Sequence, residues 1–296
     1  MSDSFTLDKR QLRRAFERAA HSYDSAAALQ REVCGRMVER LSLVKLAPQR
    51  VLDAGSGTGY AANSLLKKFP RAQLIELDIA LGMLLTARGQ RPRWRKWLPF
   101  SQRRLKLCGD NERMPIRSAA VDLVWSNLAF QWAADLESAL SESYRVLRPG
   151  GLLMFSTFGP DTLKELRVAF AGVDVAVHVN RFIDMHDIGD LLIRCGFADP
   201  VMDMEYFTLT YTQARDVMRE LKALGAHNLN AGRRRGLTGT RLWAEVTARY
   251  EQLRDRDGRL PATFEVVYGH AWKPLPRTGP GGRPVVEIKS RAAALN

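Results

Sequence analysis

The chain lacks several features that would place it in a common class of protein. No apolar stretch approaches the roughly 20 residues of a membrane-spanning helix, and the opening MSDSFTLDKR has no apolar signal core. The three cysteines, Cys34, Cys108 and Cys195, are isolated and form no C-x-x-C pair that would suggest a metal site. An odd number of isolated cysteines is typical of a reducing compartment. These absences predict a cytoplasmic protein with no bound metal.

Acidic residues are scarce relative to basic ones, with 32 Asp and Glu against 45 Lys and Arg and a formal net charge of +13. Such an excess favours an anionic partner: a nucleic acid, an acidic protein or a membrane surface. Charge alone does not choose among these partners. The length of 296 residues and the hydrophobic content of 46% are sufficient for one large domain with a full core.

The apolar periodicity predicts an α/β fold with a mostly parallel sheet and helices on both faces. Strands are expected at 50–54, 73–77, 104–108, 121–126, 151–157, 201–211 and 262–272. Helices are expected at 8–19, 24–44, 60–69, 80–88, 135–147, 161–170, 184–194, 212–224 and 240–256. The segment RPGG at 148–151 is interpreted as the turn that ends one helix before the next strand.

The most informative segment is VLDAGSGTG at 51–59, in which Asp53 precedes the alternating glycines Gly55, Gly57 and Gly59. A strand that ends in an acid, followed by a glycine turn and a helix, forms a cradle for an adenosine-bearing cofactor. Glycine lets a ligand approach the backbone closely, and the helix N-terminus adds unpaired N–H donors. The alternative is an ordinary glycine turn.

The glycine spacing differs from two other cofactor motifs. The dinucleotide fingerprint G-x-G-x-x-G requires its third glycine one residue later, and the Gly-Lys-Ser/Thr of a P-loop is absent. The carboxylate of Asp53 would repel a pyrophosphate and attract a cation. The segment resembles motif I, D/E-x-G-x-G-x-G, of the class I methyltransferases that depend on S-adenosyl-L-methionine (SAM). This resemblance implies a SAM cofactor and a Rossmann-like fold.

Polar residues at the ends of the next strands fit this interpretation. Asp78 ends the second strand, where a carboxylate can accept both ribose hydroxyls, and Glu76 is the alternative acceptor on the same side. The following IALGML resembles the D-x-S-x-x-M-L pattern of these enzymes, with Ala80 in place of the hydroxyl residue. Resemblance therefore favours Asp78 as the ribose ligand.

The third and fourth strands add further candidates for cofactor binding. Gly109-Asp110 resembles the G-D motif, whose carboxylate accepts from the adenine amine, and Asn111 and Glu112 could share that role. A turn residue is the alternative for Asp110. Asn127 and Trp132 follow the fourth strand, where polar and aromatic side chains adjoin a sulfonium. For Trp132 the alternative is a core aromatic.

Over residues 1–273 the chain is more closely similar to the malonyl-[acyl-carrier protein] O-methyltransferase family of biotin biosynthesis. The matching segments are FERAAHSYD at 16–24, SNLAFQW at 126–132, RVLRPGG at 145–151, FSTFGPDTLKELR at 155–167 and VYGHAW at 267–272. The family transfers a methyl group from SAM to the free carboxylate of a malonyl thioester. The alternatives are a quinone or phenol methyltransferase, a nucleic-acid methyltransferase, and a non-catalytic SAM-binding partner protein.

The resemblance also implies a domain organisation. A single methyltransferase domain is expected at 1–273, with a helical cap at 1–47 and a helical insertion or lid at 212–258. The implied sheet has seven strands in the order 3-2-1-4-5-7-6, with the last strand antiparallel. The density of Pro and Gly predicts a disordered tail at 274–296.

The same resemblance proposes substrate residues. Tyr23 lies in the segment that forms a lid over SAM, although it could simply pack a helix. Lys164 and Arg167 could hold the malonyl carboxylate, although exposed helix charges are usually only solvated. A carboxylate is already nucleophilic at neutral pH, so the reaction needs no strong general base.

Two basic regions are candidates for docking the acidic acyl-carrier protein. Residues 89–106 contain seven Lys and Arg, two Trp and no acid, and residues 233–241 contain a second basic cluster. Basic and aromatic residues can also bind nucleic acid. The resemblance favours the carrier protein, which such a surface would steer electrostatically.

Overall fold

The protein is described by a computed structural model that covers residues 7–89, 103–173, 178–224 and 239–276. Most of the two predicted docking regions, 89–106 and 233–241, lies outside the described residues. The same holds for all but the first three residues of the predicted disordered tail at 274–296.

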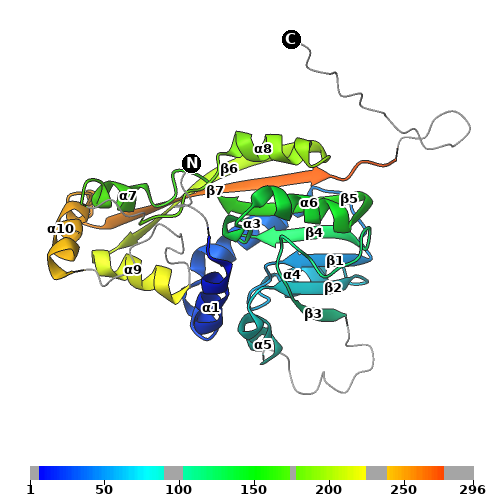
Figure 1. Ribbon diagram of the computed structural model, residues 1–296, viewed down its shortest axis with the longest axis horizontal. Helices are drawn as coiled ribbons and strands as arrows, with labels where there is room; N and C mark the ends of the chain where they lie inside the picture. Colours follow the sequence, from blue (N-terminus) through cyan, green and yellow to red (C-terminus); the bar gives the residue numbers. More distant parts are fainter. Residues whose placement is uncertain (1–6, 90–102, 174–177, 225–238, 277–296) are drawn as a thin grey trace, which may run out of the picture.

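The described residues form a seven-stranded sheet in the order β3-β2-β1-β4-β5-β7-β6 (Figure 1). The strands are β1 Arg50–Ala54, β2 Gln73–Asp78, β3 Arg104–Cys108, β4 Val121–Asn127, β5 Leu147–Phe158, β6 Ala198–Tyr211 and β7 Leu260–Trp272. β7 runs antiparallel to both of its neighbours, and the other pairs are parallel. The predicted fold class and strand order are therefore confirmed.

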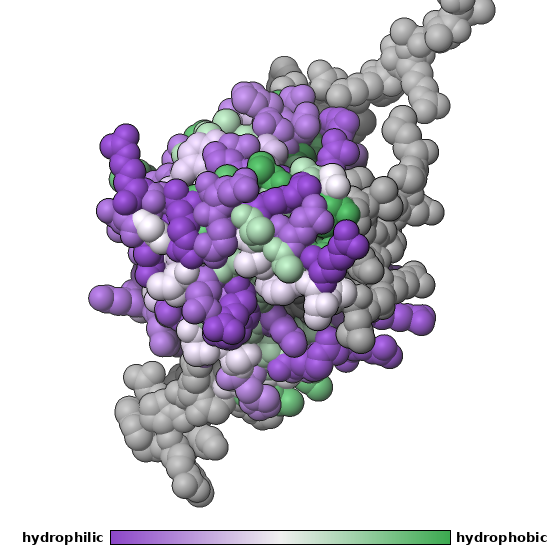
Figure 2. All heavy atoms as spheres, turned by 90° about the vertical axis from the view of Figure 1, so that its left-hand side faces the viewer, coloured by the Kyte–Doolittle hydropathy of each residue, from purple (hydrophilic) through white to green (hydrophobic). Residues whose placement is uncertain are grey.

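Helices cover both faces of this sheet (Figure 1). They are α1 Lys9–Ala19, α2 Tyr23–Ala26, α3 Ala28–Ser42, α4 Ala61–Lys68, α5 Leu81–Gly89, α6 Leu136–Val146, α7 Lys164–Phe170, α8 Met185–Arg194, α9 Ala214–Ala223 and α10 Thr240–Glu251. One buried core packs side chains of α3, α4, α7, α9 and α10 against the sheet, and a second core packs α6 and α8 against the other face. Figure 2 shows the end of the molecule on the side of α7, α9 and α10, where hydrophilic residues cover most of the surface.

Several boundaries differ from the predictions: the helix predicted at 240–256 ends at Glu251, for example, and the strand predicted at 201–211 begins at Ala198. The single helix predicted at 24–44 is divided into α2 and α3, because Ala27 has the non-helical φ and ψ of −83° and 40°. β5 begins at Leu147, so the segment 148–151 is part of a strand and not the predicted turn. Its backbone pairs with the residue that follows β7: the Gly150 N–H donates to the Lys273 carbonyl at 2.8 Å. The positive φ of Gly150, 77°, accommodates the irregular register there.

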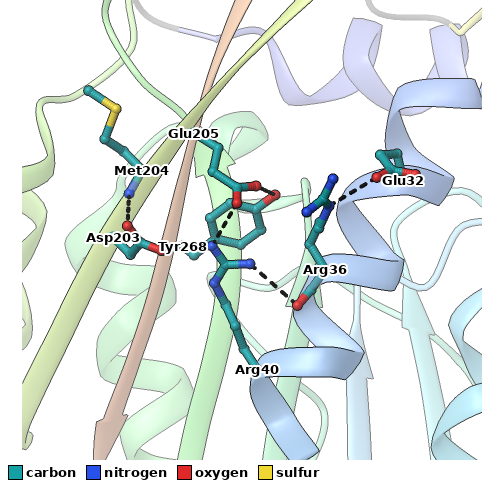
Figure 3. Close-up of polar contacts among 7 residues, drawn as sticks. All are labelled: Glu32, Arg36, Arg40, Asp203, Met204, Glu205 and Tyr268. Carbon is teal, nitrogen blue, oxygen red and sulfur yellow. Dashed lines mark hydrogen bonds and ion pairs between the residues drawn. The ribbon is translucent and has the colours of Figure 1, made fainter.

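Helix α3 is attached to the far strands of the sheet through Arg40 (Figure 3). The Arg40 guanidinium lies 3.9 Å from the centroid of the Tyr268 ring on β7. The same group pairs with Asp203 at 2.7 Å and with Glu205 at 3.2 Å, both on β6. The Tyr268 hydroxyl donates to Glu205 at 3.1 Å. These contacts fix the C-terminal end of α3, and its N-terminal end lies beside the glycine loop.

Candidate active site

The glycine loop lies between β1 and α4, as predicted from the 51–59 motif. Gly55, Gly57 and Gly59 all have positive φ, at 81°, 54° and 78°. At Gly55 a Cβ atom would lie 2.2 Å from the Cβ of Ala129, so the loop packs directly against the segment that follows β4. Only glycine is compatible with both the positive φ and the close packing against Ala129 at this position.

Asp78 lies at the end of β2 with its carboxylate directed at the glycine loop. One oxygen accepts from the Gly57 N–H at 2.9 Å, and the other accepts from the Ala80 N–H at 2.8 Å. Burial raises the pKa of Asp78 to about 6, although the two N–H donors act in the opposite direction. Glu76 is fully buried and forms a two-point ion pair with Arg104, at 2.5 and 2.8 Å. The alternative ribose acceptor is therefore already occupied.

Asp53, the acid before the loop, is buried and keeps one oxygen without a hydrogen-bond partner. Only 2% of the residue is exposed, and its Oδ2 atom has no partner. Burial raises the pKa of Asp53, with further contributions from the neighbouring charges of Glu76 and Asp78. A buried acceptor without a partner is unfavourable unless a ligand supplies the donor.

Two adjoining cavities border the loop, and together they collect most of the predicted cofactor residues. The first is lined in part by Tyr23, Gly55, Gly57, Asp78, Asp110, Asn111, Asn127 and Trp132. The second cavity shares Tyr23, Gly55, Gly57 and Asn127 with the first and adds Asp53. Gly59 lines neither cavity and closes the turn through its N–H bond to Ser56, at 2.8 Å.

Helix α1 lies across the first cavity. Its Lys9 ammonium pairs with Asp110 at 2.9 Å and with Glu112 at 2.6 Å. Its Glu17 carboxylate accepts from the backbone N–H groups of Leu81 and Gly82, at 2.8 and 2.7 Å. The sequence showed only an amphipathic helix here, because the partners of these charges are more than 60 residues away along the chain.

Aromatic side chains complete the cover over the loop. The Phe16 and Trp132 rings meet edge to face at 5.5 Å between centroids. Tyr23 lines both cavities, and its ring lies 3.9 Å from where a Cβ of Gly57 would be. Burial raises the pKa of the Tyr23 phenol, with help from the charges of Asp78 and Asp24, so the phenol is neutral and able to donate.

The amide of Asn127 has structural partners. Its Nδ2 donates to the Gln30 carbonyl at 3.0 Å, and its Oδ1 accepts from the Ser156 hydroxyl at 3.0 Å. These bonds join the N-terminal end of α3 to β4 and β5. A cofactor contact by the Asn127 side chain stays a prediction.

The two predicted carboxylate-binding residues lie in different surroundings. Arg167 lines a third cavity together with Gln131, Phe158 and Pro160, and it donates to the Pro160 carbonyl. Burial lowers the pKa of Arg167, although nearby acids oppose this effect. Lys164 is half exposed, pairs with Asp161 at 3.4 Å and is not among the residues that line the described cavities.

A fourth, mainly apolar cavity connects these regions. It shares Trp132 with the first cavity and Phe158, Val179, Asn180 and Phe182 with the third. Within the described ranges, no cluster of three metal-ligating side chains occurs. No helix in the described part of the chain is both long enough and apolar enough to cross a membrane.

Comparison with known proteins agrees with this geometry. Residues 52–155 match the methyltransferase domain family. A phosphoethanolamine N-methyltransferase 2 of Haemonchus contortus, solved in complex with SAM, shares the fold at 16% identity and a TM-score of 0.52, over 88% of this chain and 57% of that one.

Two curated relatives match nearly the whole chain. A malonyl-[acyl-carrier protein] O-methyltransferase of Gallionella capsiferriformans is 56% identical over 96% of this chain and 98% of the relative. A protein of the same name from Laribacter hongkongensis is 54% identical, with 99% and 100% covered. The chain therefore belongs to the malonyl-[acyl-carrier protein] O-methyltransferase family of class I methyltransferases.

Proposed function

We propose that the protein methylates the free carboxylate of a malonyl thioester carried by acyl-carrier protein, with SAM as the methyl donor, in biotin biosynthesis. The observation that carries the proposal is the paired cavity at the glycine loop, where Asp53 and Asp78 are buried in a chain 56% identical to a relative of that name. When bound, SAM supplies a methyl group on a positively charged sulfur.

The residues around the loop fit this cofactor. We propose that the carboxylate of Asp78, which lines the first cavity, accepts the ribose hydroxyls, and that Asp110 and Asn111 border the end of the cavity that holds the adenine. Asp53 leaves a buried oxygen for a donor that the folded chain does not supply. Trp132 closes the first cavity on the side of the apolar cavity.

The proposed substrate site lies beyond Trp132. The apolar cavity is lined by Phe158, Leu166, Phe264 and, from α9, Met218 and Leu221. Walls of this kind exclude water and suit the uncharged thioester end of an acyl chain. Arg167, at the adjoining cavity, is proposed to neutralise and align the malonyl carboxylate, and the neutral Tyr23 phenol to orient it.

Alignment and neutralisation suffice for this chemistry, because a carboxylate needs no deprotonation before it attacks. Lys164 is left out of the proposed site, since it already pairs with Asp161 outside the cavities. We propose 212–258 as a lid over the substrate, which is supported by α9, the described helix of this region that lines the apolar cavity. We propose the N-terminal helices, residues 1–47, as the cover of the cofactor.

The carrier protein is proposed to dock through the basic regions 89–106 and 233–241. The net charge of +13 supports an acidic partner, which a basic surface would attract electrostatically. A cytoplasmic location is supported by the three free cysteines, which are typical of a reducing compartment.

A transfer assay tests the proposed function. The protein is incubated with methyl-labelled SAM and with malonyl-, acetyl- or unloaded acyl-carrier protein. We expect label only on the malonyl form, as a base-labile ester. Label on none of the carriers would overturn the proposal, and salt-sensitive binding to RNA without any methylation of the carrier would favour a nucleic-acid enzyme.

A further inference from the structure

Three buried polar atoms around the second cavity have no hydrogen-bond partner. They are Oε1 of Gln30, Oδ2 of Asp53 and the hydroxyl oxygen of Ser56. All three residues line the same cavity, beside the glycine loop. Since buried polar groups in folded proteins are nearly always paired, a group of unpaired atoms at one cavity indicates a ligand that supplies the missing partners.

Gln30 is held in place independently of its side chain. Its backbone carbonyl accepts from Asn127 at 3.0 Å, and Asn127 accepts in turn from Ser156. The other end of α3 is fixed by the contacts of Arg40 with β6 and β7 (Figure 3). The amide oxygen is therefore buried at the cavity by a fixed backbone, and no described contact of that oxygen stabilises the free protein.

The chemistry of the cavity is complementary to a zwitterion. Asp53 and Gln30 each offer an unpaired acceptor oxygen, which suits a group with several N–H donors. Arg31 lines the same cavity with a cationic guanidinium and donates to the Asp24 carbonyl at 2.5 Å. The Asp24 carboxylate is directed at the Thr58 hydroxyl, which lies at 2.5 Å. An α-amino acid carries both an ammonium and a carboxylate, so it matches both sets of groups.

We infer that this cavity recognises the amino-acid end of the cofactor, with Gln30 and Asp53 on the α-ammonium group and Arg31 on the α-carboxylate. The inference rests on the proposed function, because it takes SAM as the ligand. It adds two residues of α3 to the cofactor site. Neither of them belongs to the glycine motif.

Calorimetry with three ligands separates these roles. The ligands are SAM, decarboxylated SAM, which keeps the ammonium but lacks the carboxylate, and 5′-methylthioadenosine, which lacks both. Gln30→Met is expected to weaken SAM and decarboxylated SAM by about tenfold and to leave methylthioadenosine unchanged. Arg31→Met is expected to weaken only SAM, by a similar factor.

Thermal unfolding of the ligand-free protein distinguishes a ligand-binding role of Gln30 from a structural one. Gln30→Met removes an unpaired buried oxygen, so its melting temperature is expected to be no lower than that of the wild type. The matched control is Gln131→Met, since Gln131 has the same unpaired Oε1 but lines the third cavity. We expect the affinity of this control for SAM to be unchanged.

The outcomes distinguish the inference from the proposed function. If the wild type binds SAM but both α3 variants retain its affinity for all three ligands, the inference is wrong and the proposed function stands. Equal losses for SAM and methylthioadenosine, together with a lower melting temperature, would also overturn the inference, since they indicate a structural role. A wild type that binds none of the ligands would contradict the proposed function itself.

Discussion

The acids near the glycine loop and those near β5 and β7 differ in whether the fold supplies hydrogen-bond donors to them. At the glycine loop, Asp53 keeps an oxygen without a partner, and burial together with the charges of Glu76 and Asp78 raises the pKa of its carboxyl group. On the β5–β7 side, the buried Glu265 accepts from the Asp161 N–H at 2.7 Å, and the partly buried Glu165 accepts from the Thr263 N–H at 3.0 Å. A buried acid is therefore not in itself a sign of a site. The informative observation is whether the fold already supplies its donors.

The walls of the cofactor cavity and of the apolar cavity also differ, in the polarity of the groups that line them. The cofactor side combines backbone N–H groups, carboxylates and amides, whereas the apolar cavity is built on aromatic contacts such as Phe158 with Phe182, at 5.6 Å between centroids. Arg167 contributes a cation at the adjoining third cavity. We expect cofactor binding to depend on several polar contacts, and substrate binding to depend strongly on this arginine.

The largest effect is expected in the glycine loop, which defines the cofactor side. Gly55→Ala places a methyl group 2.2 Å from Ala129 at a φ of +81°, so it should lower the free energy of unfolding by about 2–4 kcal/mol. Gly57→Ala is the control, because its nearest neighbour lies at 3.9 Å and only backbone strain of about 1–2 kcal/mol is expected. Urea denaturation measures both. Equal losses would show that the loop is not tightly packed.

The second prediction concerns the substrate side. Arg167→Gln should raise the KM for a malonyl thioester by about 10–100-fold, because a charge-assisted hydrogen bond is lost, and should leave the Kd for SAM unchanged. Lys164→Gln is the control on the same helix. Its KM should change by less than about twofold, since exposed ion pairs contribute little. A larger effect for Lys164 than for Arg167 would reverse the assignment.

The third prediction is a pH dependence that belongs to the cofactor side. Burial places the pKa of Asp78 at about 6, so SAM binding should weaken as the pH falls through that value and the carboxylate becomes protonated. The free protein should respond in the opposite way. Because the pKa is higher in the folded chain than in the unfolded chain, stability falls as the pH rises from about 4 to about 6.

Asp78→Asn should remove the contribution of Asp78 to both of these pH effects, while the raised pKa of Asp53 leaves its own contribution to the pH dependence of stability. We expect it to weaken SAM binding by about 1–3 kcal/mol at neutral pH, through the loss of charge-assisted hydrogen bonds to the ribose. Calorimetry between about pH 5 and pH 8 provides the measurement. If the wild type and the variant have the same pH profile, Asp78 is not the ribose ligand.

The sequence predicted the fold and the glycine motif because both depend on local information. The strands are short apolar runs between helices, and Asp53, Gly55 and Asp78 lie in or beside contiguous motifs. The geometry supports the preference for Asp78 over Glu76 that the motif resemblance gave, because Glu76 forms a buried pair with Arg104.

The residues that the sequence left out act through distant partners. Lys9 meets Asp110 across 101 positions, and Gln30 adjoins the cavity because α3 is bonded to Asn127, 97 positions away. The division between α2 and α3 occurs at an alanine, which is a good helix former. Tertiary contacts such as the bond between Asp24 and Thr58 therefore override local propensity there.

The smallest effect is expected at Arg40, which connects the two sides of the sheet through α3. Arg40→Met removes two partly exposed ion pairs and a stacking contact with Tyr268, so the free energy of unfolding should fall by about 1 kcal/mol. The loss should be smaller at high salt, because exposed charges are screened. Urea denaturation at two salt concentrations measures it.

The Arg40 variant also tests whether the two sides are independent. Arg36→Met is the control, since the ion pair that Arg36 forms with Glu32 lies within one helix and is more exposed, so its loss should change stability less. If the sides are independent, Arg40→Met leaves the Kd for SAM unchanged. If Arg40→Met weakens SAM binding by more free energy than the variant loses in stability, the contacts of α3 with β6 and β7 position the cofactor-binding end of α3. The glycine-loop region and the β6–β7 region would then be energetically coupled and not independent.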